Sequence, residues 1–141
     1  MTRRATAVLI LVFVFAATFA FSQTTIQKSP ARYTSPASGH DMYKAYCASC
    51  HGLTGKGDGP AAPALKNPVP DLTTIKARNG GTFPSAHILQ VVRGDANSPS
   101  HGSKDMPVWG PVFLAVSEHQ PARVQQRAQN LTSYIESLQA K

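Results

Sequence analysis

The most regular pattern of hydrophobic and polar positions lies at the C-terminal end of the chain. After Gln120-Pro121, apolar residues recur at steps of four, three, four and three positions. This spacing gathers them on one face of a helix, and that face must pack against other apolar groups. Proline suits the first turn of a helix, so the helix is predicted to begin at Pro121. The apolar stripe consists of Val124, Ala128, Leu131, Ile135 and Leu138.

A second helical pattern starts near Ser38. This serine is a suitable N-cap, and Asp41 falls in the first turn, where a carboxylate interacts favourably with the helix dipole. Further residues then recur at three- and four-residue steps, which places them on one helical face. They are Met42, Tyr43, Tyr46, Cys47 and Cys50.

Three shorter segments complete the predicted helices. One begins at Asp71 and is broken by Gly80-Gly81, a second runs from Pro84-Ser85 to Gly94, and a third covers residues 108–116. The sequence has no strand-like alternation and no internal repeat. The pattern therefore predicts an all-α fold of several short helices.

Two long loops join these helices. Residues 52–70 are rich in Gly and Pro, and residues 95–105 are polar. A loop as long as the first is uncommon in a small protein unless it wraps something. We therefore expect a bound group to substitute for part of the hydrophobic core.

The N-terminal residues have the features of a secretion signal. Met1–Arg4 is short and basic, and Ala5–Phe21 is almost wholly apolar. Ala20 and Ser22 fit a small-residue cleavage site, so residues 1–22 form the predicted signal peptide and the mature chain begins at Gln23. An uncleaved membrane anchor is the alternative, because 17 residues are at the lower limit for crossing a bilayer. Either interpretation places the folded part outside the cytoplasm, as in a periplasm.

Removal of this signal leaves 119 of the 141 residues, which suits one domain. Residues 23–37 are rich in Ser, Thr and Pro without periodicity, so we expect a flexible leader with little fixed structure. Residues 38–141 form the predicted domain.

The charge of the chain is moderately basic. Loss of Arg3 and Arg4 lowers the formal net charge from +7 to +5. Such a surface favours docking onto acidic patches of partner proteins. The Lys and Arg residues are scattered and no aromatic residues are interleaved with them, which argues against nucleic-acid binding.

Both cysteines lie in the stretch Cys47-Ala48-Ser49-Cys50-His51, which reads C-x-x-C-H, the attachment signal for a c-type haem. Two thiols about one helical turn apart can each add to a vinyl group on the same edge of a porphyrin, giving two thioether bonds. The adjoining imidazole is then held against the iron, for which a neutral ring nitrogen is a good ligand. Cys47 and Cys50 are the predicted attachment residues, and His51 is the predicted axial ligand.

Three other interpretations of this stretch compete with haem attachment. A structural disulfide would leave His51 unexplained, and a thioredoxin-like redox pair requires a preceding βαβ pattern that the sequence lacks. A zinc site needs a fourth ligand from an unrelated place, and there is no second C-x-x-C to supply it.

Met106 is the predicted second axial ligand. Met1 leaves with the signal, and Met42 precedes Cys47 by five residues on the same helix, from which it cannot cross to the opposite haem face. Met106 lies in a polar loop flanked by Pro and Gly, where a core methionine has little core to join. His101 is the competing ligand.

Two further residues are candidates for contact with the haem. Trp109 follows Met106 by three positions and is expected near the haem, with a generic core tryptophan as the alternative. Arg93 is a candidate partner for a haem propionate, with a solvated arginine at a helix end as the alternative.

From about Ser38 to Gln139 the chain resembles class I cytochromes c, and bacterial monohaem members in particular. In that family a glycine and an aromatic residue lie eight and four positions before the first haem cysteine, where Gly39 and Tyr43 stand here. They pack against an aliphatic and an aromatic residue of the last helix, roles that Leu131 and Tyr134 match. The resemblance implies a cytochrome c-like fold around one covalently attached haem.

The resemblance also assigns roles on the two sides of the haem. Family members carry a proline whose carbonyl accepts a hydrogen bond from the haem histidine Nδ1, and a leucine that packs on the haem. Pro63 and Leu65 have the matching order and spacing. The run Asp105-Met106-Pro107-Val108-Trp109-Gly110 resembles the segment that bears the methionine ligand.

The resemblance implies electron transfer without catalysis on the chain itself. The expected partners are redox proteins with acidic docking patches, such as a membrane oxidase, a dehydrogenase or a quinol-oxidising complex. A membrane is expected as a partner only if the N-terminal segment is uncleaved. The alternatives are a haem c subunit of a larger oxidoreductase or respiratory complex and a haem peroxidase with an open sixth iron position.

Overall fold

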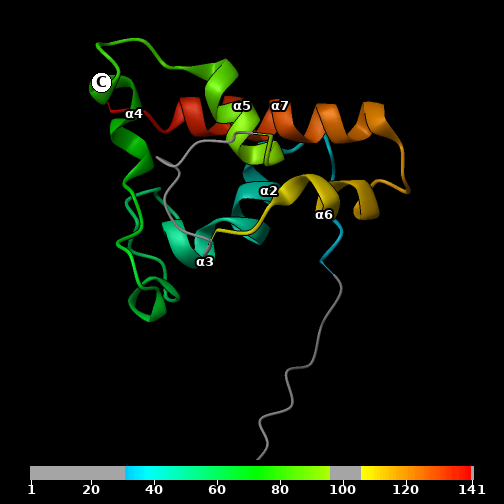
Figure 1. Cartoon of the computed structure of the whole chain (residues 1–141), viewed down its shortest axis with the longest axis horizontal. Helices are drawn as coiled ribbons and strands as arrows, with labels where there is room; N and C mark the ends of the chain where they lie inside the picture. The colour runs from blue at the N-terminus through cyan, green and yellow to red at the C-terminus, as the bar shows by residue number, and fades with distance from the viewer. Residues whose placement is uncertain (1–30, 96–105, 141) are drawn as a thin grey trace, which may run out of the picture. The chain divides into compact units, whose positions relative to one another are not determined.

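The computed structural model describes residues 31–95 and 106–140, which form helices and loops without a β-strand (Figure 1). This confirms the all-α prediction. The predicted signal peptide, residues 23–30 of the predicted leader and His101 lie outside the described residues. None of the described helices is long and apolar enough to cross a membrane. In chain order the helices are α2 (Gly39–Tyr46), α3 (Ala48–His51), the 3₁₀ turns η1 (Ala62–Ala64) and η2 (Leu72–Thr74), α4 (Ile75–Arg78), α5 (Ser85–Arg93), α6 (Trp109–Val116) and α7 (Pro121–Ser137).

Local sequence signals set the helix ends. The Ser38 side chain accepts a hydrogen bond from the Asp41 backbone N–H at 3.1 Å, as expected for an N-cap. Helix α5 ends where Gly94 takes a left-handed conformation with φ of 80°, which costs glycine little. Pro121 occupies the first position of α7. These three helix ends match the sequence prediction.

Helix α7 is the element against which α2, α5 and α6 all pack (Figure 1). Its contact with α2 is close, because a Cβ on Gly39 would collide with the Asn130 carbonyl and lie 2.8 Å from the Tyr134 Cβ. The Tyr43 and Tyr134 rings lie 5.2 Å apart between centroids. The expected contact of Gly39 and Tyr43 with an aromatic residue of the last helix is therefore confirmed.

Residues 31–37, the described part of the predicted flexible leader, are held against the helices. The Tyr46 hydroxyl donates a hydrogen bond to the Arg32 carbonyl, and Arg127 Nη1 donates to Thr34 Oγ1 at 3.1 Å. Asn130 Nδ2 donates to the Pro36 carbonyl at 2.8 Å. The expectation of little fixed structure is wrong for these residues, because polar groups on α2 and α7 find partners there.

The contact between α2 and α7 predicts that Gly39→Ala destabilises the protein. The added methyl group meets backbone on α7, which cannot rotate away as a side chain can, so the two helices must separate. We expect a loss of about 1–3 kcal/mol in the free energy of unfolding, measured by denaturant titration.

Gly80→Ala serves as the control for this substitution. A Cβ at Gly80 has no atom within 4 Å, although its φ of 65° still disfavours alanine. A loss at Gly39 no larger than that at Gly80 would contradict the proposed helix contact.

Candidate functional site

A cavity of about 300 Å³ lies among the described helices. Its walls include Cys47 and His51 from the C-x-x-C-H stretch, Leu131 and Ile135 from α7, and the segment that holds Met106 and Trp109. Its volume and mostly apolar lining are typical of cofactor sites. Leu131, expected to contact α2 in the manner of the family, lines this cavity and is fully buried.

The C-x-x-C-H stretch folds as a short helix at the end of α2. Cys47 caps α3, and its carbonyl accepts hydrogen bonds from the backbone N–H groups of Cys50 and His51 at 3.1 and 2.9 Å. Both cysteines are free thiols: Cys47 is buried against the cavity, and Cys50 is half-buried. Burial raises the pKa of Cys47 to about 12, so its thiol stays protonated in the folded chain.

His51 lines the cavity through a buried imidazole. Its Nδ1 lies 3.4 Å from the Pro70 carbonyl oxygen, which can only accept a hydrogen bond, so Nδ1 carries the proton and Nε2 retains its lone pair. Burial lowers the pKa of this imidazole, with the Pro70 contact acting in the opposite direction. Both the neutral form and the fixed tautomer suit metal ligation.

The predicted roles of Pro63 and Leu65 are wrong in this structure. Pro63 is exposed in η1, and Leu65 is half-buried but does not line the cavity. Pro70 and Leu72 have the same Pro-x-Leu spacing and take these places. The Leu72 backbone N–H donates to the Gly55 carbonyl at 2.7 Å, which brings the second Pro-x-Leu segment back towards the C-x-x-C-H stretch.

Met106 and Trp109 line the same cavity as His51. The Trp109 ring lies 5.3 Å from the Tyr46 ring and 6.1 Å from the Phe113 ring, between centroids. Trp109 is therefore both a cavity residue and part of an aromatic cluster. The ligation of iron by Met106 stays a prediction.

The arginine that lines the cavity is Arg78, whereas Arg93 was the predicted one. Arg93 does not line it: Nε pairs with Asp95 at 2.8 Å, and Nη1 donates to Gln125 at 2.9 Å. Arg78 does line it and donates from Nη2 to the Asp71 carbonyl at 2.8 Å. Arg78 is the last residue of the short helix α4, and no local sequence signal distinguishes it from a solvent-facing arginine at a helix end.

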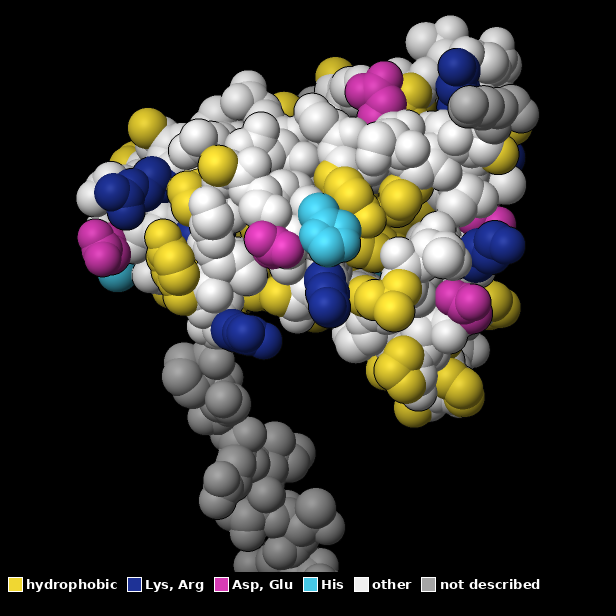
Figure 2. Space-filling view, turned by 180° about the vertical axis from the view of Figure 1, so that it is seen from behind, with side chains coloured by type: hydrophobic (Ala, Val, Ile, Leu, Met, Phe, Trp, Pro, Cys, Tyr) yellow, Lys and Arg dark blue, Asp and Glu magenta, His cyan; other side chains and the backbone are white. Residues whose placement is uncertain are grey.

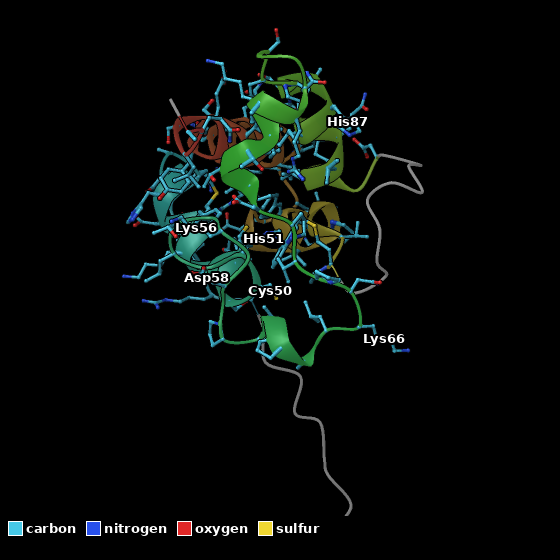
Figure 3. All side chains as sticks on the ribbon, turned by 90° about the vertical axis from the view of Figure 1, so that its left-hand side faces the viewer. Cys50, His51, Lys56, Asp58, Lys66 and His87 are labelled. Atoms are coloured by element: carbon cyan, nitrogen blue, oxygen red, sulfur yellow. The ribbon has the colours of Figure 1, made fainter. Side chains whose placement is uncertain are left out.

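Two more polar residues, Asn79 and His87, line the cavity and were missed as site residues. His87 lies in the first turn of a predicted helix and was expected at the surface. Figure 3 shows His51 and His87 coming from different parts of the chain, whereas Lys66 points away on the outer loop. The cavity thus combines apolar walls with a few polar groups.

The donor set fits a covalently attached haem. Two free thiols, Cys47 and Cys50, immediately precede the His51 imidazole, which lines a cavity, and the Met106 thioether lines the same cavity. Within residues 31–95 and 106–140, no three His, Cys, Asp or Glu side chains gather as a metal-ion site.

The turn that presents Pro70 and Leu72 depends on Asp71. Its carboxylate accepts hydrogen bonds from the Thr73 N–H and hydroxyl at 2.7 and 2.6 Å, and these bonds lower the pKa of Asp71. A lowered pKa means that the stabilisation is present above the unfolded-state pKa and is lost as pH falls through the folded-state pKa. We expect Asp71→Asn to lower the melting temperature at neutral pH, with the difference from wild type shrinking below about pH 4.

Thermal unfolding followed by circular dichroism from neutral to acidic pH measures this difference. Glu136→Gln, an exposed change on α7, is the control for loss of one negative charge. A difference between wild type and Asp71→Asn that persists unchanged into acid would show that the carboxylate does not stabilise the turn.

One of three comparisons with known proteins gives a match. No curated protein and no solved structure matches the chain significantly. The model of one family, described as Cytochrome c, matches residues 36–139. That range contains the C-x-x-C-H stretch and every cavity residue named above, and it covers most of the chain. The chain therefore belongs to the cytochrome c family.

Proposed function

We propose that the protein is a monohaem c-type cytochrome of the bacterial class I kind that carries one electron between redox proteins. Membership of the cytochrome c family supports a haem-based electron-transfer role. The observation that carries the finer proposal is that His51 and Met106 line one cavity together with Cys47. In this proposal, Cys47 and Cys50 hold the haem, and His51 and Met106 are its axial ligands.

Each of these residues has a separate task. The thiols pin the macrocycle, the Pro70 carbonyl orients the His51 ring, and buried apolar side chains such as Ile88 and Ile135 exclude water. The bound haem supplies an iron that gains and loses one electron. Two protein ligands leave no iron position for a substrate, which favours electron transfer over peroxidase chemistry.

The polar residues of the cavity suit the haem carboxylates. We assign propionate binding to Arg78 and Asn79, which replace Arg93 in this role. A guanidinium binds a carboxylate in a planar, charge-assisted arrangement, and its bond to the Asp71 carbonyl holds Arg78 in place.

The proposed partners are proteins with acidic patches outside the cytoplasm, reached after removal of residues 1–22. The support is the net charge of +5 for the mature chain and its signal-like N-terminus. On the face seen in Figure 2, Lys and Arg side chains are spread among acidic ones, without a large patch of one sign. Such a surface suits brief docking. A haem subunit of a larger oxidoreductase is the second candidate, favoured by the family match because many complexes use the same fold.

Met106 ligation predicts the absorption spectrum of the ferric holoprotein. The wild type should show the weak long-wavelength band that sulfur ligation gives to ferric haem, and Met106→Ala should abolish it. His101→Ala is the matched control, because His101 is the competing ligand. A band that survives Met106→Ala but not His101→Ala would reverse the assignment.

Electron transfer predicts a rate that depends on ionic strength. Stopped-flow reaction of the reduced protein with an oxidase-containing membrane fraction should be fast and should slow as salt rises, since the screening length is about 10 Å at 0.1 M. Carbon monoxide titration of the same reduced protein should show little binding. Rapid stoichiometric binding with peroxide turnover would favour the peroxidase alternative, and salt-insensitive transfer within an isolated complex would favour the subunit alternative.

A further inference from the structure

Arg127 is the largest fully buried side chain in the described part of the protein. Arginine is almost never fully buried unless it is paired, yet none of the described carboxylates forms an ion pair with it. Its guanidinium is instead satisfied by neutral oxygens. Nε donates to Ser117 Oγ at 2.9 Å, Nη1 donates to Thr34 Oγ1 at 3.1 Å, and Nη2 lies 3.5 Å from the Val116 carbonyl.

The bond from Arg127 to Thr34 fixes the direction of a longer chain of hydrogen bonds. Arginine has no acceptor atom, so Thr34 Oγ1 must accept from it. The Thr34 hydroxyl proton is then free to be donated to Tyr46 Oη, 2.9 Å away, and Tyr46 donates its own proton to the Arg32 carbonyl. Each bond polarises the next, and the chain starts from a cation. We call these four residues, Arg32, Thr34, Tyr46 and Arg127, the clasp.

The clasp lies behind the cavity wall and reaches it through Trp109. Tyr46 is largely buried, and its ring contacts the rings of Trp109 and Phe113 at centroid distances of 5.3 and 5.8 Å. Trp109 lines the cavity and follows Met106 by three residues. Fixing the Tyr46 hydroxyl therefore fixes the ring that supports Trp109 from behind.

We propose that the clasp is a positioning device for the sixth-ligand side of the haem, holding Trp109 and the adjoining Met106 against the iron. This inference rests on the proposed ligation by Met106. A firmly held segment resists displacement of its ligand, because an external ligand must move the methionine and the tryptophan beside it. Loss of a hydrogen bond in the clasp lowers the free-energy cost of displacing Met106, while the Met106 side chain itself is unchanged.

The test is imidazole titration of the ferric holoprotein, followed by the change in the main absorption band of the haem, which every variant retains. Thr34→Val keeps the branched shape but interrupts the hydrogen-bond chain, and Tyr46→Phe keeps the ring on Trp109 but removes its hydroxyl. Each should raise imidazole affinity roughly two- to tenfold, the effect expected for one intramolecular hydrogen bond. Thr34→Ser retains the hydroxyl and should restore affinity close to that of wild type.

The double variant Thr34→Val/Tyr46→Phe should show less than the sum of the two single effects, because both changes interrupt one chain. Ser38→Ala removes the N-cap at the end of α2 opposite Tyr46 and is the control for general destabilisation. It should lower stability in denaturant while leaving imidazole affinity unchanged. Both single variants retain the Arg127 charge, so a change in imidazole affinity cannot be attributed to loss of a charge near the haem.

The outcomes separate the clasp from the ligation on which it rests. If Met106→Ala binds imidazole no more tightly than wild type, Met106 is not the ligand and the proposed function loses its sixth-ligand assignment. If Met106→Ala gains affinity while Thr34→Val and Tyr46→Phe do not, or gain no more than Ser38→Ala, the clasp has no positioning role.

Discussion

The packing of α7 against α2 is the contact on which the rest of the structure depends. On one face of α7, the Asn130 carbonyl and Tyr134 lie so close to Gly39 that no side chain fits between them. On the neighbouring face, Leu131 and Ile135 form part of the cavity wall. Helix α2 leads directly into the C-x-x-C-H stretch, so the packing of α2 against α7 also determines the position of Cys47, Cys50 and His51. A core of this kind is completed by a bound group, which explains how a small domain with long loops can form a stable fold.

The two sides of the cavity are built in different ways. On the His51 side, the chain folds back over a short distance: Gly57 N–H donates to the His51 carbonyl at 2.8 Å, and Leu72 N–H donates to the Gly55 carbonyl at 2.7 Å. The Met106 side is assembled from α6 and from residues 32–34, which are far apart in sequence. Closing long loops costs more conformational entropy than closing short ones. The contacts on the His51 side therefore form at a smaller cost in conformational entropy, because they join residues that are closer in the sequence.

The sequence was sufficient to predict most of the helices, but not every residue that lines the cavity. Helical periodicity and end signals such as Ser38, Gly94 and Pro121 act locally, so they can be read without the fold. The choice between Pro63 and Pro70 cannot be made in this way, because both precede a leucine by two residues. Only the tertiary bond between Leu72 and Gly55 decides it. Arg78 was missed for a similar reason, since an arginine at the end of a short helix has the same local signature whether it faces solvent or a cavity.

Arg127 shows why buried polar groups are the hardest part of such a fold to predict. Charged residues are expected at the surface, and a helix stripe is identified by its apolar members, so Arg127 falls outside the pattern that identifies α7. Its burial is tolerated because Ser117, Thr34 and Val116 supply oxygen atoms and the exposed Tyr33 ring lies 5.3 Å from the guanidinium carbon. These partners come from two separate segments, the C-terminal end of α6 and residues 33–34. Loss of one of these oxygen acceptors leaves a buried donor unsatisfied, which costs more than the bond itself contributes. An apolar residue at this position would need no hydrogen-bond acceptors, but it would not determine where residues 32–34 lie. The buried cation therefore makes the path of the N-terminal segment depend on the correct placement of both α6 and α7.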